Sequence, residues 1–162
     1  MQFTDTHKFD KPAATVLKMF SDRAYFERKY QELGFGNVEV LECTNDGRKF
    51  RIKARYSAPL NAPLPDFAKK FLAANNVITQ SDTWDLDKKT GRLEAEIRGV
   101  PVKVVADMKL SDEGAGSANT LKWDLSCGIP FIGGKLEQLV AGDIQAKGKA
   151  DSAKSREILK SY

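Results

Sequence analysis

Few side chains in this sequence have the type and spacing that catalysis requires. His7 is the only histidine in the chain, and it falls on a predicted first strand close to the start. A histidine dyad or a Ser-His-Asp triad needs the imidazole within hydrogen-bond reach of its partners, so an arrangement of that kind is nearly excluded. We expect His7 to be an exposed histidine or one at the edge of a sheet.

The clearest polar signal lies on a predicted strand over residues 77–87. Gln80 and Asp82 share a face with Trp84, because side chains alternate along a strand. If Trp84 points into the core, both polar groups follow it, and each costs about 1–3 kcal/mol if it is left unpaired. Protein partners, water or the head group of a ligand would then satisfy them. The alternative is a bulge near Gln80 that turns both residues outward.

Metal, nucleotide and cofactor signatures are missing from the sequence. Cys43 and Cys127 have no metal-ligand spacing, and we interpret both as reduced, small hydrophobic residues. There is no HExxH pattern, and no strand runs into a GxGxxG turn that would bind a dinucleotide. We therefore predict no metal and no cofactor.

Composition and charge are typical of a soluble domain without a nucleic-acid partner. The 162 residues are 41% hydrophobic and 30% charged, with a net charge of +4, and this length suits a single domain over 1–162. The densest basic stretch, 48–55, alternates with apolar residues, so we expect a solvated strand face partly paired with carboxylates. No apolar run approaches the ~18 residues of a membrane span. No secretory signal is visible, so we expect a cytoplasmic protein.

The periodicity predicts a strand, two short helices, six strands in a meander and one long C-terminal helix. Strands are expected at 2–9, from 36, at 50–56, at 77–87, at 93–97, at 100–110 and at 120–127, and helices at 13–20 and 23–33. The apolar stripe of the last helix is strong at its start and weakens after Ile144. Tight turns make neighbouring strands antiparallel. The sequence therefore predicts an α+β fold, in which a seven-stranded curved antiparallel sheet wraps around the long helix.

Such a sheet encloses more width than one helix of about 10 Å covers. Either large side chains fill the remaining space or a cavity persists, and on geometry alone both outcomes stay open. The residues expected to line a cavity face inward from the strands and helices: Tyr30, Phe50, Ile52, Tyr56, Phe71, Gln80, Asp82, Trp84, Leu93, Ile97, Val104, Met108, Trp123, Leu136 and Val140.

The segment between the strands at 50–56 and 77–87 is longer than a turn requires. It begins with prolines and continues as a predicted short amphipathic helix over 67–74. Long insertions of this kind often cover openings. We expect Phe67, Phe71 and Leu72 to act as a lid over the mouth of the cavity. The stretch 111–118 contains two glycines and is expected to be a loop.

Three segments carry a resemblance to a known family: DKPAATV at 10–16, SDRAY at 21–25 and PFIGGKLE at 130–137. Together with the order of elements, they resemble the START/SRPBCC superfamily, which has the helix-grip fold of birch-pollen-allergen-like proteins and polyketide cyclases. More narrowly, the chain is similar to a bacterial branch known only as a domain of unknown function. The resemblance covers nearly the whole chain. It implies a hydrophobic ligand held between the sheet and the C-terminal helix.

Three functions are compatible with these features. The one we favour is binding or transport of a hydrophobic small molecule, such as a lipid, an isoprenoid, a sterol-like or a polyketide-like compound. An alternative is a cyclase or aromatase that uses Asp82 and Tyr56 in the same cavity. The third is an interaction module whose basic strand 48–55 meets an acidic partner or an anionic membrane. We expect a monomer or weak dimer, with at most transient contact with a membrane surface.

Overall fold

The strands and helices follow one another in the predicted order. The computed structural model describes residues 1–162. Its strands are β1 (Gln2–Phe9), β2 (Gly36–Asn45), β3 (Lys49–Pro59), β4 (Asn75–Asp85), β5 (Thr90–Ile97), β6 (Lys103–Glu113) and β7 (Gly116–Ser126). Its helices are α1 (Ala13–Phe20), α2 (Arg23–Glu32) and α3 (Gly133–Leu159), with a 3₁₀ turn η1 (Asp66–Ala68). The seven strands form one antiparallel sheet in the order β1-β7-β6-β5-β4-β3-β2, so the predicted fold class is confirmed.

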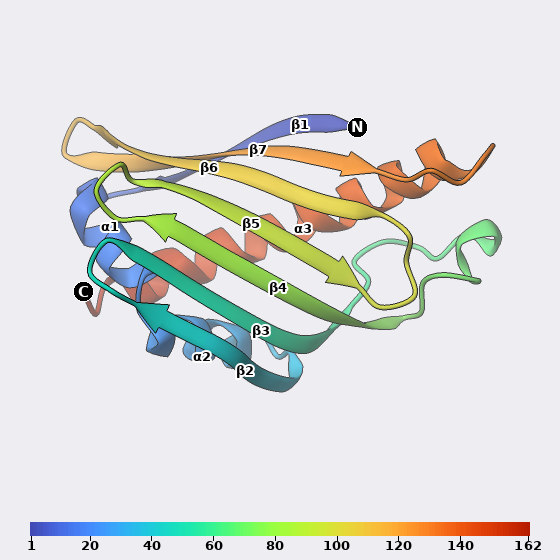
Figure 1. Ribbon diagram of the computed structural model, residues 1–162, viewed down its shortest axis with the longest axis horizontal. Helices are drawn as coiled ribbons and strands as arrows, with labels where there is room; N and C mark the ends of the chain where they lie inside the picture. Colours follow the sequence, from blue (N-terminus) through green and yellow to red (C-terminus); the bar gives the residue numbers. More distant parts are fainter.

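The helices cover the concave face and one end of the curved sheet (Figure 1). Between the edge strands β1 and β2, the chain forms α1 and α2, which lie at the end of the sheet near the C-terminus. The carboxylate of Asp22 begins α2 by accepting a hydrogen bond of 3.0 Å from the Ala24 amide. None of the helices combines the length and the hydropathy that a membrane-spanning helix requires.

The first half of α3 closes one part of the interior. Leu136 and Val140 are 0% and 1% exposed and belong to the hydrophobic core. Leu125 of β7 is equally buried and lies in the same core. This region is packed like an ordinary protein interior. The apolar stripe predicted for the start of the helix is therefore buried against the sheet.

Two connections differ from the predictions. The helix expected over 67–74 shrinks to the turn η1, because Asn76 binds both the amide and the carbonyl of Ala73 and so competes with helical bonding. The loop expected at 111–118 is a hairpin tip, as predicted, but it is shorter, because β6 and β7 stay paired up to Glu113 and Gly116. Gly114 takes a left-handed φ of +62° there, which lets β6 and β7 extend to the turn.

The basic face of β3 is paired with carboxylates on its neighbour, as predicted. Arg55 Nη2 lies 2.7 Å from Glu39 Oε2, and Arg51 Nε lies 3.7 Å from Glu42 Oε2. Both acidic residues belong to β2. Exposed ion pairs of this kind are worth at most about 1 kcal/mol each, so they describe a solvated outer face whose positive charge is partly neutralised.

A candidate ligand-binding cavity

A cavity of about 150 Å³ lies between the sheet, α2 and the second half of α3. The space is not filled by the protein's own side chains. An engineered apolar cavity of about this size in another protein admits benzene, so the free volume here matches one ring. Residues that line it and were predicted to do so are Tyr30, Tyr56, Gln80, Asp82, Trp84, Leu93, Ile97, Val104, Met108 and Trp123.

The other predicted residues lie elsewhere. Phe50 and Ile52 point inward from β3 but are 1% exposed and packed in the core, as are Leu136 and Val140 of α3. The sequence pattern identifies an inward face and does not distinguish its packed part from its hollow part. Phe71 lies in the β3–β4 segment and does not line the cavity.

The segment expected to act as a lid contributes to the core instead. Leu72 and the neighbouring Ala68 are buried in the hydrophobic core, and Phe67 packs against it. Neither Phe67 nor Leu72 lines the cavity. Asn61, at the start of the segment, donates its backbone N–H to Asp143 Oδ1 of α3 at 2.7 Å. This hydrogen bond connects the segment to the helix.

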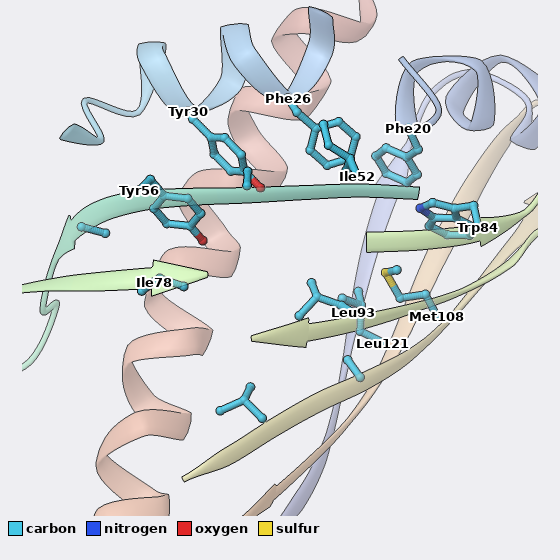
Figure 2. Close-up of a cluster of buried hydrophobic side chains, with 14 of the residues drawn as sticks. Phe20, Phe26, Tyr30, Ile52, Tyr56, Ile78, Trp84, Leu93, Met108 and Leu121 are labelled. Atoms are coloured by element: carbon cyan, nitrogen blue, oxygen red, sulfur yellow. The ribbon is translucent and has the colours of Figure 1, made fainter. Parts of the chain in front are cut away.

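Aromatic rings form one wall of the cavity (Figure 2). Tyr30 projects from α2 towards Tyr56 of β3, with their ring centroids 4.6 Å apart. At the other end of this wall, Phe20 stacks on Trp84 with a centroid separation of 5.5 Å. Gly91 makes room for the indole, because a Cβ at that position would lie 2.8 Å from Trp84 Cδ2. The wall is therefore preformed by contacts among its own rings.

Polar groups interrupt this wall on β4. The pairing of β4 with β3 and β5 is continuous, without a bulge, so Gln80 and Asp82 face inward together with Trp84. Tyr56 donates its hydroxyl to Gln80 Oε1 at 2.8 Å, and Gln80 Nε2 donates to Asp82 Oδ1 at 2.8 Å. The question that the sequence leaves open is thus settled in favour of the inward orientation. These three side chains form a hydrogen-bonded chain along the cavity.

A buried ion pair joins α2 to α3 beside this chain. Lys29 Nζ lies 2.9 Å from Asp151 Oδ2, and the lysine side chain is 6% exposed. Tyr25 and Ser155 complete the network through hydroxyl groups 2.7 Å apart. Sequence analysis missed Lys29, although it stands on the inner stripe of α2 between Phe26 and Tyr30. A lysine on an apolar stripe is the signal that could have found it.

The opposite wall contains polar atoms without partners. Asn119 Oδ1 and Trp123 Nε1 of β7 are buried and make no hydrogen bond. His7 of β1 is paired with Asn119 across the strands and lines the cavity as well. His7 lies on an edge strand of the sheet, as expected, but its side chain is half-buried and faces inward. Gly148 of α3 lies beside this histidine, because a Cβ at position 148 would be 3.7 Å from His7 Nε2.

Burial shifts the acid–base properties of the cavity. It raises the pKa of the Asp82 carboxyl to about 6, against a smaller opposing effect of the Lys29 ammonium. Burial is the largest single influence on Lys29 and by itself would lower its pKa, but the Asp151 carboxylate, together with Tyr25, Tyr30 and Asp82, holds the pKa well above its ordinary value. Burial lowers the pKa of His7. At neutral pH the cavity therefore contains a charged lysine, a neutral histidine and a carboxyl that titrates near the physiological range.

Comparison with solved structures identifies the fold. A START superfamily protein from Mycobacterium smegmatis is 12% identical, with 97% of this chain and 98% of that chain covered and a TM-score of 0.56. The Zhui aromatase/cyclase from Streptomyces sp. R1128 is 11% identical, with coverage of 99% and 93% and a TM-score of 0.67. Ara h 8.0201 is 14% identical, with coverage of 100% and 99% and a TM-score of 0.68. The chain shares the fold of these proteins, which is the helix-grip fold that the sequence resemblance implied.

The family follows from the sequence itself. Residues 4–158 match the model of the family described as "Protein of unknown function (DUF2505)", so the chain belongs to that family. No curated protein matches the chain.

Proposed function

We propose that the protein binds a hydrophobic small molecule in the cavity between the sheet and α3. The observation that carries this proposal is the combination of an unfilled, largely apolar space with buried polar atoms that have no partner. A buried hydrogen-bonding group without a partner costs about 1–3 kcal/mol, and such groups are rare in native interiors. A guest molecule that reaches them would remove this cost.

The two orphaned atoms specify what a ligand must offer. Trp123 Nε1 is a donor and needs an acceptor, while Asn119 Oδ1 is an acceptor and needs a donor. A hydroxyl group meets either requirement. The apolar remainder of the ligand would gain roughly 25 cal/mol for each Å² that it removes from water, before ordering costs. The ligand is therefore a mainly apolar ring or short chain that carries hydrogen-bonding groups.

The size of the cavity narrows the ligand classes further. Sites for drug-sized ligands usually measure about 300–1,000 Å³, and this one measures about 150 Å³. A sterol-like or multi-ring polyketide-like molecule requires the walls to move apart, whereas a molecule with one ring fits the structure as it stands. Single-ring compounds are the appropriate first probes.

Intrinsic fluorescence gives a direct test, because both tryptophans of the chain line the cavity. Titration with benzyl alcohol should change the emission saturably. The variant Ala95→Leu adds bulk to the cavity wall and should weaken binding several-fold. The matched variant Ala150→Leu places the same bulk on the exposed side of α3 and should bind as the wild type does. A lack of saturable binding, or equal binding by both variants, would contradict the proposal.

A further inference from the structure

We propose that the natural ligand of this cavity is an organic cation, namely a protonated amine attached to a ring, and that Asp82 is its counter-ion. The inference rests on the proposed binding function and names the chemical class of the ligand. It is drawn from the charges inside the cavity, from the free oxygen of Asp82 and from the faces of the surrounding rings.

The charged residues that line the cavity do not balance. Its carboxylates are Asp82, Asp143 and Asp151, and its ammonium groups are Lys29 and Lys147. Lys29 is paired with Asp151, and Lys147 is paired with Asp143 four residues earlier on α3. No ion pair involves Asp82, and His7 is neutral at physiological pH. When Asp82 is ionised, the cavity therefore carries one unpaired negative charge.

The protein satisfies only half of the Asp82 carboxyl. Its Oδ1 accepts a hydrogen bond from Gln80, and no group of the protein donates to its second oxygen. The residue is 7% exposed, so bulk water does little to solvate it. A buried carboxylate in such a setting is stabilised strongly by a positive charge at hydrogen-bond distance. A ligand ammonium would supply both the charge and the missing donor.

The rings around Asp82 suit an ammonium for an independent reason. Aromatic faces attract cations within about 6 Å of the ring centroid. Rings that line the same cavity already surround one ammonium, because Lys29 Nζ lies 4.8, 5.2 and 5.3 Å from the centroids of Tyr25, Phe26 and Tyr30. Trp84, on the same face of β4 as Asp82, and Tyr56 provide further aromatic surface at the cavity. The single-ring volume leaves room for a compact amine.

Three probes of nearly equal size separate this inference from simple hydrophobic binding. Benzylamine is a cation at pH 7.5, benzyl alcohol is neutral and benzoate is an anion. Binding is followed by ¹H–¹⁵N spectra, with the indole signals of Trp84 and Trp123 as reporters inside the cavity. We expect benzylamine to bind at least tenfold more tightly than benzyl alcohol, and benzoate to bind most weakly.

The variant Asp82→Asn removes the charge and keeps the shape of the side chain, and its amide oxygen can still accept from Gln80. It should weaken benzylamine binding at least tenfold and benzyl alcohol binding by a much smaller factor, in line with the usual strength of buried charge-assisted contacts. The ¹H–¹⁵N spectrum of the variant checks that its fold is intact. The control Asp124→Asn makes the same chemical change on an exposed residue of β7 and should alter neither affinity.

The outcomes distinguish the two proposals. If benzyl alcohol binds as tightly as benzylamine, or if Asp82→Asn leaves benzylamine binding unchanged, the inference of a cationic ligand is overturned while hydrophobic binding stands. If benzoate binds most tightly, an anionic ligand replaces the cationic one. If none of the probes shifts the indole signals, the proposed binding function itself fails, and the inference fails with it.

Discussion

The two halves of α3 meet the same sheet with opposite chemistry. Before Gly142, the inward positions are apolar, and Leu136 and Val140 are buried in the core. After it, the positions that face inward include Asp143 and Asp151, which line the cavity. The facing strands are mostly apolar but also present polar side chains to the cavity, such as Asp82 of β4 and Asn119 of β7. The helix and the strands therefore both contribute to the difference.

This contrast explains why the cavity lies against the second half of α3. A polar helix face cannot be packed against apolar strands unless each buried group finds a partner. The second half of α3 meets this requirement with ion pairs to its own turns and to α2, such as Asp151 with Lys29. These pairs hold the helix in place without filling the space above the sheet. Gly148 adds to the effect, because it brings no side chain to the wall.

The largest expected effect comes from truncating the packed half. Leu136→Ala should lower the free energy of unfolding by about 2–5 kcal/mol, since it removes a fully buried side chain from a close-packed region. Ser152→Ala, in the polar half, removes only a hydroxyl that accepts from Arg156 at 2.7 Å and should cost less than about 1.5 kcal/mol. Urea denaturation of both variants measures the difference. Equal losses would mean that the two halves are packed alike.

The next effect concerns Asp82 and the pH dependence of stability. Its pKa is about 6 in the folded protein and 3.8 in the unfolded chain. Between pH 3.8 and pH 6, the folded state therefore keeps a proton that the unfolded state has released. The contribution of this group to the free energy of unfolding is present below pH 4 and is lost as the pH rises through 6. The loss amounts to about 3 kcal/mol, from about 1.4 kcal/mol for each pH unit.

The variant Asp82→Asn has no carboxyl group to ionise, so its free energy of unfolding should not fall in this way as the pH rises. Its stability relative to the wild type should therefore improve by about 2–3 kcal/mol between pH 4 and pH 7.5. Lys29, Tyr30 and Tyr56 face the group and keep their protons over this range, because their pKa values are raised. Urea denaturation of both proteins at the two pH values gives the difference. A constant difference would show that the carboxyl is solvated, and the unfilled space would then not isolate it from water.

Most of the fold could be predicted from the sequence, because it depends on local patterns. Alternation identifies the strands, and the spacing of apolar residues identifies α1, α2 and α3. The inward orientation of Gln80 and Asp82 was harder to predict, since one bulge reverses it and no residue in β4 signals whether a bulge occurs. The helix expected over 67–74 failed for a related reason: Asn76 competes for the backbone of Ala73, and this bond depends on the fold of the turn.

The content of the cavity was the least predictable part. Lys29 finds its partner Asp151 far along the chain, and no local pattern pairs them. The same holds for His7 and Asn119, which face each other only because β1 returns to pair with β7. Sequence analysis identifies inward faces. The position of the hollow depends on which inward faces meet across the fold.

The smallest expected effect tests whether Gly148 helps to keep the cavity open. Replacing a glycine inside a helix with alanine should stabilise the protein by up to about 1 kcal/mol, and Gly142→Ala and Gly148→Ala should both show this gain. The added methyl group meets nothing within 4 Å at Gly142, whereas at Gly148 it lies 3.7 Å from His7 on the cavity wall. We therefore expect a few-fold loss of benzyl alcohol affinity for Gly148→Ala alone, measured by fluorescence titration alongside urea denaturation. Similar affinities in both variants would mean that the ligand does not reach this part of the wall, and the contrast between the halves of α3 would then concern stability and not binding.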